Sequence, residues 1–237
     1  MELSEPLLYI CGTTVATYLF YLIDRALLLA RFQKPYYAVH VLHNIGIVAL
    51  TAPDLVRSFT QFYEIAYLPF NWPAVCLCYA LHFYHTFVYW RSFELDDWLH
   101  HGLMIGIALP LGSTVAAGPL MGFSLFFTTG LPGALCYALL FLSRNGWICY
   151  ERIKPWNSFI YVWIRSPGCV ALATLTLVSI MSNRTTTTWE LAVGLCTAAL
   201  NYWNGQYFMR QVVAWEAISK LKVELAGANN RVQKADE

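Results

Sequence analysis

Seven stretches of this 237-residue chain are apolar over a length that can cross a membrane. A spanning helix needs about 20 mainly apolar residues. Charged residues make up only 12% of the chain, roughly half of the share usual in soluble proteins. The stretches lie at residues 7–30, 36–52, 67–90, 98–116, 120–142, 158–181 and 189–213. The sequence therefore predicts an all-α, polytopic membrane protein with seven transmembrane helices in a single domain, residues 1–237.

Prolines set the expected limits of several helices, because proline lacks a backbone N–H and disturbs the preceding turn. The second span should end at Pro53, the Gly130-Leu131-Pro132 sequence interrupts the fifth, and Pro167 lies inside the sixth. After the last span, residues 214–226 indicate a short amphipathic helix and residues 227–237 a polar, disordered tail. Both segments would lie in the cytosol in the orientation that the basic residues predict.

The distribution of basic residues predicts the orientation. Cytosolic loops of membrane proteins are enriched in Lys and Arg. If the N-terminus is lumenal, the outer loops carry only Arg57 and Arg184. The inner loops and the tail then carry Arg31, Lys34, Arg91, Arg144, Arg152, Lys154, Lys220, Lys222, Arg231 and Lys234. We therefore predict a lumenal N-terminus and a cytosolic C-terminus.

All six histidines precede residue 102 and form three close pairs. Ionisable side chains are costly inside a membrane and commonly mark a functional site. In the predicted orientation the pairs lie at the cytosolic ends of three consecutive helices: His40 and His43, His82 and His85, His100 and His101. Residues three or four apart share a helix face. His40 and His43 therefore share one face of their helix, and His82, His85 and Tyr89 share one face of the next. The adjacent His100 and His101 diverge by about 100°, so only one of them can point into a central cavity.

Other polar groups occur at the same depth. Arg165 in the sixth span could bind a lipid phosphate or pair with Asp24, and Asn201 and Asn204 share one side of the seventh span. The two asparagines could instead join helices by hydrogen bonds. We interpret Asp24 and Arg25 as an interfacial anchor, with the arginine reaching toward the headgroups.

Several of these residues resemble a known family. Tyr79, followed by Leu99-His100-His101 at the start of the next predicted helix, resembles the tyrosine and double-histidine pattern of the TLC domain family of lipid-related membrane proteins. The similarity covers roughly residues 31–213. Further positions resemble the pattern of the family: His40 or His43, Pro132 in Thr128-Thr129-Gly130-Leu131-Pro132, and Asn201-Tyr202-Trp203-Asn204 with Phe208 and Arg210.

This resemblance implies a ring of six helices around a lipid-accessible tunnel, with one peripheral helix, in the endoplasmic reticulum. The ceramide synthases of the family carry a further histidine and paired aspartates after the double histidine. Here no acidic residue occurs between Asp97 and Glu151. Ceramide synthase activity is therefore not what we expect.

The leading hypothesis is acyl transfer or hydrolysis on a lipid, with acyl-CoA or an acyl lipid as the donor. An imidazole suits proton transfer near neutral pH, so His100 or His101 would be the base. His82 or His85 would orient the base or bind the acyl carbonyl. The expected substrate-binding residues are His40, His43, Tyr89, Arg165, Asn201 and Asn204. No cofactor is required beyond acyl-CoA as a co-substrate.

Two alternatives remain open. A lipid-binding, sensing or transport protein could keep the tunnel without catalysis, which the missing acidic residues favour. A metal-dependent, lipid-modifying enzyme could use all six histidines, His40, His43, His82, His85, His100 and His101, as ligands. The expected partners are membrane lipids, with a homo-oligomer left open. A net charge of +1 gives no basic signature for nucleic acid.

Overall fold

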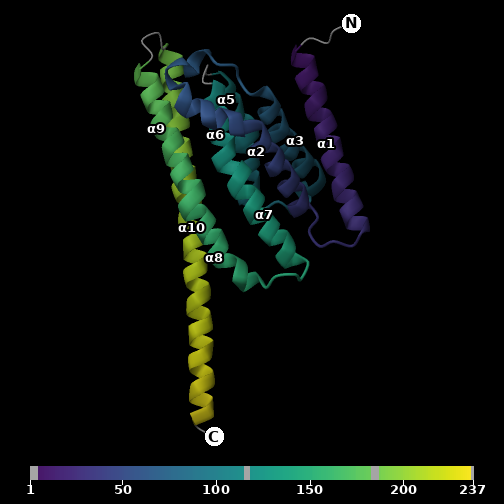
Figure 1. Ribbon diagram of the computed structural model, residues 1–237. Helices are drawn as coiled ribbons and strands as arrows, with labels where there is room; N and C mark the ends of the chain where they lie inside the picture. Colours follow the sequence, from purple (N-terminus) through teal and green to yellow (C-terminus); the bar gives the residue numbers. More distant parts are fainter. Residues whose placement is uncertain (1–4, 115–117, 183–186, 236–237) are drawn as a thin grey trace.

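The computed structural model describes residues 5–114, 118–182 and 187–235. Helices make up 91% of the described residues, and no strand occurs among them, which confirms the predicted all-α class. Figure 1 shows helical rods that run alternately up and down, with the two chain ends at opposite ends of the molecule. Among the described residues, four helical segments are long and apolar enough to cross a membrane: Glu5–Leu29, Tyr36–Thr60, Gly118–Arg144 and Tyr150–Ser182.

Helix α2 (Tyr36–Thr60) packs against several others. It contacts α3 (Trp72–Tyr89), α6 (Gly118–Leu125) and α7 (Leu131–Arg144), whereas α1 (Glu5–Leu29) packs mainly on α3 at one side of the molecule (Figure 1). Helix α1 is largely exposed, as expected of a helix that faces lipid. Both histidine pairs on α2 and α3 therefore lie within the packed part of the fold.

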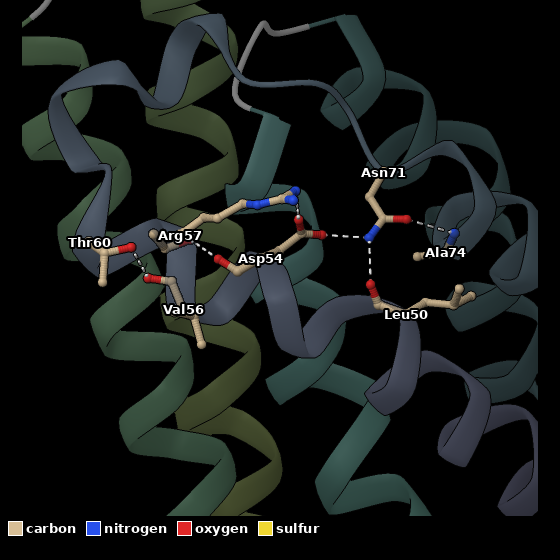
Figure 2. A network of polar contacts seen from close by, with 8 residues as sticks. Leu50, Asp54, Val56, Arg57, Thr60, Asn71 and Ala74 are labelled. Atoms are coloured by element: carbon tan, nitrogen blue, oxygen red, sulfur yellow. Dashed lines mark hydrogen bonds and ion pairs between the residues drawn. The ribbon is translucent and has the colours of Figure 1, made fainter.

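The expectation that the second helix ends at Pro53 is wrong, because α2 continues to Thr60. A polar network holds the extra turns (Figure 2). The buried Asp54 carboxylate accepts a hydrogen bond of 2.5 Å from the Asn71 side-chain amide, which also donates to the Leu50 carbonyl. Asn71 in turn caps α3 by accepting from the Ala74 N–H. These bonds offset the backbone hydrogen bond that proline removes.

Three helical rods each contain a π-helical segment. They are η3 (Met104–Ala108) between α4 (Leu95–Leu103) and α5 (Leu109–Thr114), η4 (Phe126–Gly130) between α6 and α7, and η5 (Tyr161–Arg165) between α8 (Tyr150–Ile160) and α9 (Ser166–Ser182). In each rod a proline, Pro110, Pro132 or Pro167, follows the π segment by two residues. The ring of a helical proline clashes with the carbonyl four residues earlier, which here lies in the π segment. The wider turn relieves that clash, so these prolines reshape the helices without ending them.

Some helix boundaries differ from the expected ones. Residues 62–67, which include the expected start of the third span, form the 3-10 helix η1 (Phe62–Tyr67), and the 3-10 helix η2 (Trp90–Ser92) follows α3. Helix α4 begins at Leu95, three residues before the expected start, because Glu94 and Asp97 form a capping box that satisfies free N–H groups of its first turn.

Helix α10 (Thr188–Ala235) is one continuous helix. The expected break after residue 213 and the disordered tail from residue 227 are not seen as far as Ala235. The segment lacks proline and is rich in good helix formers. Helix α10 packs along α9 and α8, and its lower half extends past the other helices (Figure 1). Arg184, used in the orientation argument, lies outside the described residues.

Candidate histidine site

Five histidine rings from three helices lie against one another. The His40 and His85 ring centres are 5.1 Å apart, and those of His85 and His101 are also 5.1 Å apart. His82 lies 5.1 Å from His101 and 5.5 Å from His100. The structure therefore brings together residues that lie up to 61 positions apart in the chain (101 minus 40).

Hydrogen bonds fix the tautomer of three histidines. The Nδ1 atoms of His40 and His82 lie 2.7 Å and 2.8 Å from the backbone carbonyls of Tyr36 and Cys78. His43 Nδ1 lies 2.8 Å from the Asn44 side-chain oxygen. An oxygen of these types only accepts, so each Nδ1–H donates and each Nε2 keeps a lone pair. Such a nitrogen can take a proton or bind a metal.

His43 lies apart from the other five. Its ring packs edge-on against Phe20, and its buried Nε2 has no hydrogen-bond partner. The Asn44 oxygen that holds it also accepts a hydrogen bond from the Thr129 hydroxyl of η4. A Cβ at Gly133 would lie 2.4 Å from the Asn44 Nδ2, so glycine is needed for the close approach of α2 and α7.

His100 and His101 point to different surroundings. His101 is buried and stacks on Phe93, and its Nε2 lies 3.1 Å from the His85 Nδ1. His100 is exposed, unlike the half-buried His85 and the four buried histidines. It is the histidine that a substrate can reach most directly.

A buried carboxylate adjoins the cluster, and sequence reasoning did not assign it a role there. Asp24 is fully buried and accepts hydrogen bonds of 2.7 Å and 2.6 Å from the Tyr84 and Tyr89 hydroxyls. Its other oxygen pairs with Arg25 at 2.5 Å. The interpretation of this pair as an interfacial anchor therefore fails for Asp24, whose burial is stabilised by four N–H or O–H donors. Tyr89 also packs on His85, with ring centres 5.4 Å apart, and so links Asp24 to the cluster.

Tyrosine rings complete the wall of the cluster. Tyr36 lies 5.5 Å from His85, and Tyr137 of α7 lies 4.3 Å from His40, between ring centres. Neither tyrosine was a predicted site residue. The four-residue spacing from Tyr36 to His40 was a usable signal, since it places both on one helix face. Nothing local in the sequence pointed to Tyr137.

A separate cavity of about 120 Å³ lies among α5, α6, α9 and α10. Asn201 and Asn204 line it, as do Ser124 and Thr128, while most of the remaining lining is apolar. Met104 also lines it, and Met104 follows His100 by one helical turn. The cavity thus adjoins the histidine cluster on the α4 side, although none of the histidines lines it.

Arg165 lies behind this cavity and not beside Asp24. Its Nη2 donates to the Asn204 side-chain oxygen at 2.7 Å, and its Nη1 donates to the Tyr161 hydroxyl at 3.1 Å. The guanidinium lies 4.6 Å from the centre of the Phe208 ring. The alternative pairing of Arg165 with Asp24 is therefore excluded by the geometry.

As oriented in the described part of the chain, no three His, Cys, Asp or Glu side chains are grouped so as to hold a metal ion. The rings of His82, His100 and His101 nevertheless form a triangle with sides of 5.1 to 5.5 Å. Three imidazoles on one tetrahedral zinc ion have ring centres about 5 Å apart. The three rings thus have the spacing of zinc ligands but not their orientation.

Comparison with known proteins adds no family to this picture, since no protein-family model, curated protein or solved structure matches the chain.

Proposed function

We propose that this chain is an integral membrane enzyme that transfers or hydrolyses the acyl group of a lipid, with His100 as general base. One observation carries the proposal: His100 is exposed at the edge of a cluster whose other members are buried or half-buried. A reachable imidazole held by a packed histidine layer suits proton transfer to and from a substrate.

In the proposed reaction, His100 takes a proton from the hydroxyl, amine or water that attacks the acyl carbonyl. The carbon forms a bond to this nucleophile, and the bond to the leaving oxygen or sulfur breaks. The proton on His100 then passes to the leaving group, so that the imidazole is regenerated. Acyl-CoA or an acyl lipid is the donor, and no other cofactor takes part.

The other histidines act as positioning residues. The contact between His101 and His85 ties α4 to α3, which fixes the backbone that carries His100. His82 packs beside His100, and its Nδ1–H is engaged by the Cys78 carbonyl. Orientation of this kind contributes to catalysis because it removes the need to order the base during the reaction.

We further propose a seven-span topology in the endoplasmic reticulum, with a lumenal N-terminus, a cytosolic C-terminus and a TLC-like arrangement. The alternating rods in Figure 1 support this topology. Contacts between neighbouring helices support a ring: α3 packs on α2, α2 on α6 and α7, α9 on α10, and α10 on α5. Helix α1, on the outside of α3, corresponds to the peripheral helix.

The test is lipid mass spectrometry after incubation of vesicle-reconstituted protein with an acyl-CoA and the vesicle lipids. We expect a new acyl lipid or free fatty acid with the wild type, and a loss of about 100-fold or more for His100→Ala. Leu95→Ala, at an exposed position in the first turn of the same helix, is the matched control. Bound lipid without turnover by the wild type would instead support the non-catalytic alternative.

The triangle of His82, His100 and His101 favours a second candidate, a metal-dependent lipid-modifying enzyme. Their spacing fits ligands of one zinc ion, and the carbonyl that fixes His82 is the usual second partner of a metal-bound imidazole. Metal content measured by mass spectrometry decides between the candidates, with the His82→Ala/His85→Ala double variant as the comparison.

A further inference from the structure

Arg165 has neutral partners only. Its two terminal nitrogens donate to Asn204 and Tyr161, and the rings of Tyr161 and Phe208 lie 5.0 Å and 4.6 Å from its guanidinium carbon. The third nitrogen, Nε, is buried without a hydrogen-bond partner. An unsatisfied buried donor on a charged group is costly, so this guanidinium retains the capacity to bind one more acceptor.

No carboxylate within the described ranges forms an ion pair with Arg165. The two buried aspartates are already engaged, Asp24 by Arg25 and two tyrosines, and Asp54 by Asn71 and Arg57. Glu151, on the same rod as Arg165, pairs with Lys154. A cation inside a membrane segment is costly without a counter-ion, and the described protein supplies none here.

The cavity beside Asn204 is elongated along α10 and mainly apolar. Along α10 it extends from Gly194 to Asn204, a helical length of about 15 Å. Its lining includes Leu109, Leu120, Leu125 and Leu172, which suit an acyl chain. Asn204 lies at the end of this run and is the residue that Arg165 binds. Arg165 does not line the cavity itself, but it lies one hydrogen bond away from the lining, behind Asn204.

We propose that Arg165 binds the oxyanion of a lipid headgroup, a phosphate or a carboxylate, while the acyl chain of that lipid occupies this cavity. The Nε–H would donate to the oxyanion, and the negative charge would balance the guanidinium. This inference rests on the proposed function in one respect only, since it makes the bound lipid the substrate that His100 attacks. Binding itself does not require turnover.

The same oxyanion chemistry could come from a phospholipid, a fatty acid, the phosphates of acyl-CoA or free phosphate. The experiment is native mass spectrometry of the detergent-purified full chain with phosphatidic acid, with palmitic acid and with a diacylglycerol of matched chains. Coenzyme A and inorganic phosphate serve as soluble competitors. We expect phosphatidic acid or palmitic acid to bind about tenfold to 100-fold more tightly than diacylglycerol, with no displacement by phosphate or coenzyme A.

Arg165→Gln should remove this preference for the anionic lipid, and Arg152→Gln, at an exposed position on the same rod, should retain it. Equal binding of diacylglycerol and both anionic lipids to the wild type would overturn the proposal without recourse to any variant. Displacement by free phosphate or coenzyme A would also overturn it, because the site would then recognise a soluble anion. His100→Ala should keep the lipid preference, so a failure of the proposed catalysis is distinguishable from a failure of this inference.

Discussion

The Nδ1 atom of His85 lies 3.1 Å from the Nε2 atom of His101. One of the two nitrogens must carry the proton of this contact and the other must accept it. The contact joins the C-terminal part of α3 to the last turn of α4, next to the exposed His100. The Thr86 hydroxyl lies 3.4 Å from the other nitrogen of His101, so the buried ring is engaged on both sides.

His85→Ala should destabilise the protein by about 1–3 kcal/mol, because it leaves the buried Nε2 of His101 without a partner. Thermal unfolding of the detergent-purified protein measures this change. Phe87→Ala, at an exposed position on the same helix, should have a much smaller effect. Equal losses in the two variants would mean that the histidine contact contributes little to the stability of α3 and α4.

Asp24→Asn should destabilise the protein by about 2–3 kcal/mol, because the carboxylate accepts hydrogen bonds from Tyr84, Tyr89 and Arg25 together. This loss should exceed that of removing either tyrosine hydroxyl. Tyr84→Phe alone should cost about 1 kcal/mol. In a double-mutant cycle the Tyr84→Phe cost should shrink in the Asp24→Asn background. Glu5→Gln, at the exposed start of the same helix, is the control. Additive costs would show that the two side chains do not act together.

Gly133→Ala should be destabilising, since the added methyl carbon would lie 2.4 Å from the Asn44 amide nitrogen. Either α7 must move away from α2 or Asn44 must release His43 and Thr129. We expect a loss of about 1–3 kcal/mol. Gly12→Ala meets nothing within 4 Å and should be neutral or stabilising by up to about 1 kcal/mol. Thermal unfolding of both variants tests the contrast, and a neutral Gly133→Ala would contradict the close approach.

Residue spacing alone was enough to anticipate part of the site. Residues three apart share a helix face, so His82 and His85 could be expected to act together. Adjacent residues diverge by about 100°, so His100 and His101 could be expected to face different surroundings. The membrane setting made all six histidines candidates. Spacing could not distinguish His43, which faces Asn44 and Phe20, because that depends on how α2 packs on its neighbours.

Tertiary contacts explain what the sequence did not reveal. Pro53 looks like a helix end until Asn71, from beyond the next turn, is seen to bond with Leu50 and Asp54. Pro132 looks like an interruption, whereas a π segment accommodates it within a continuous rod. Asp24 was interpreted with Arg25 as an interfacial anchor, whereas it is buried against tyrosines sixty or more residues away. In each case the partner is distant in the chain.

The proposed general-base chemistry predicts that turnover survives removal of metal ions. Zinc ligation by His101 through Nε2 would have to break its contact with His85, and the nitrogen on the other side of the ring faces Thr86. We therefore expect the purified protein to contain well below one equivalent of zinc, iron or copper. Lipid conversion should be unchanged after dialysis against a chelator. Stoichiometric metal that is lost in the His82→Ala/His85→Ala variant, with activity restored by added zinc, would instead establish the metal-dependent candidate and make His100 a ligand.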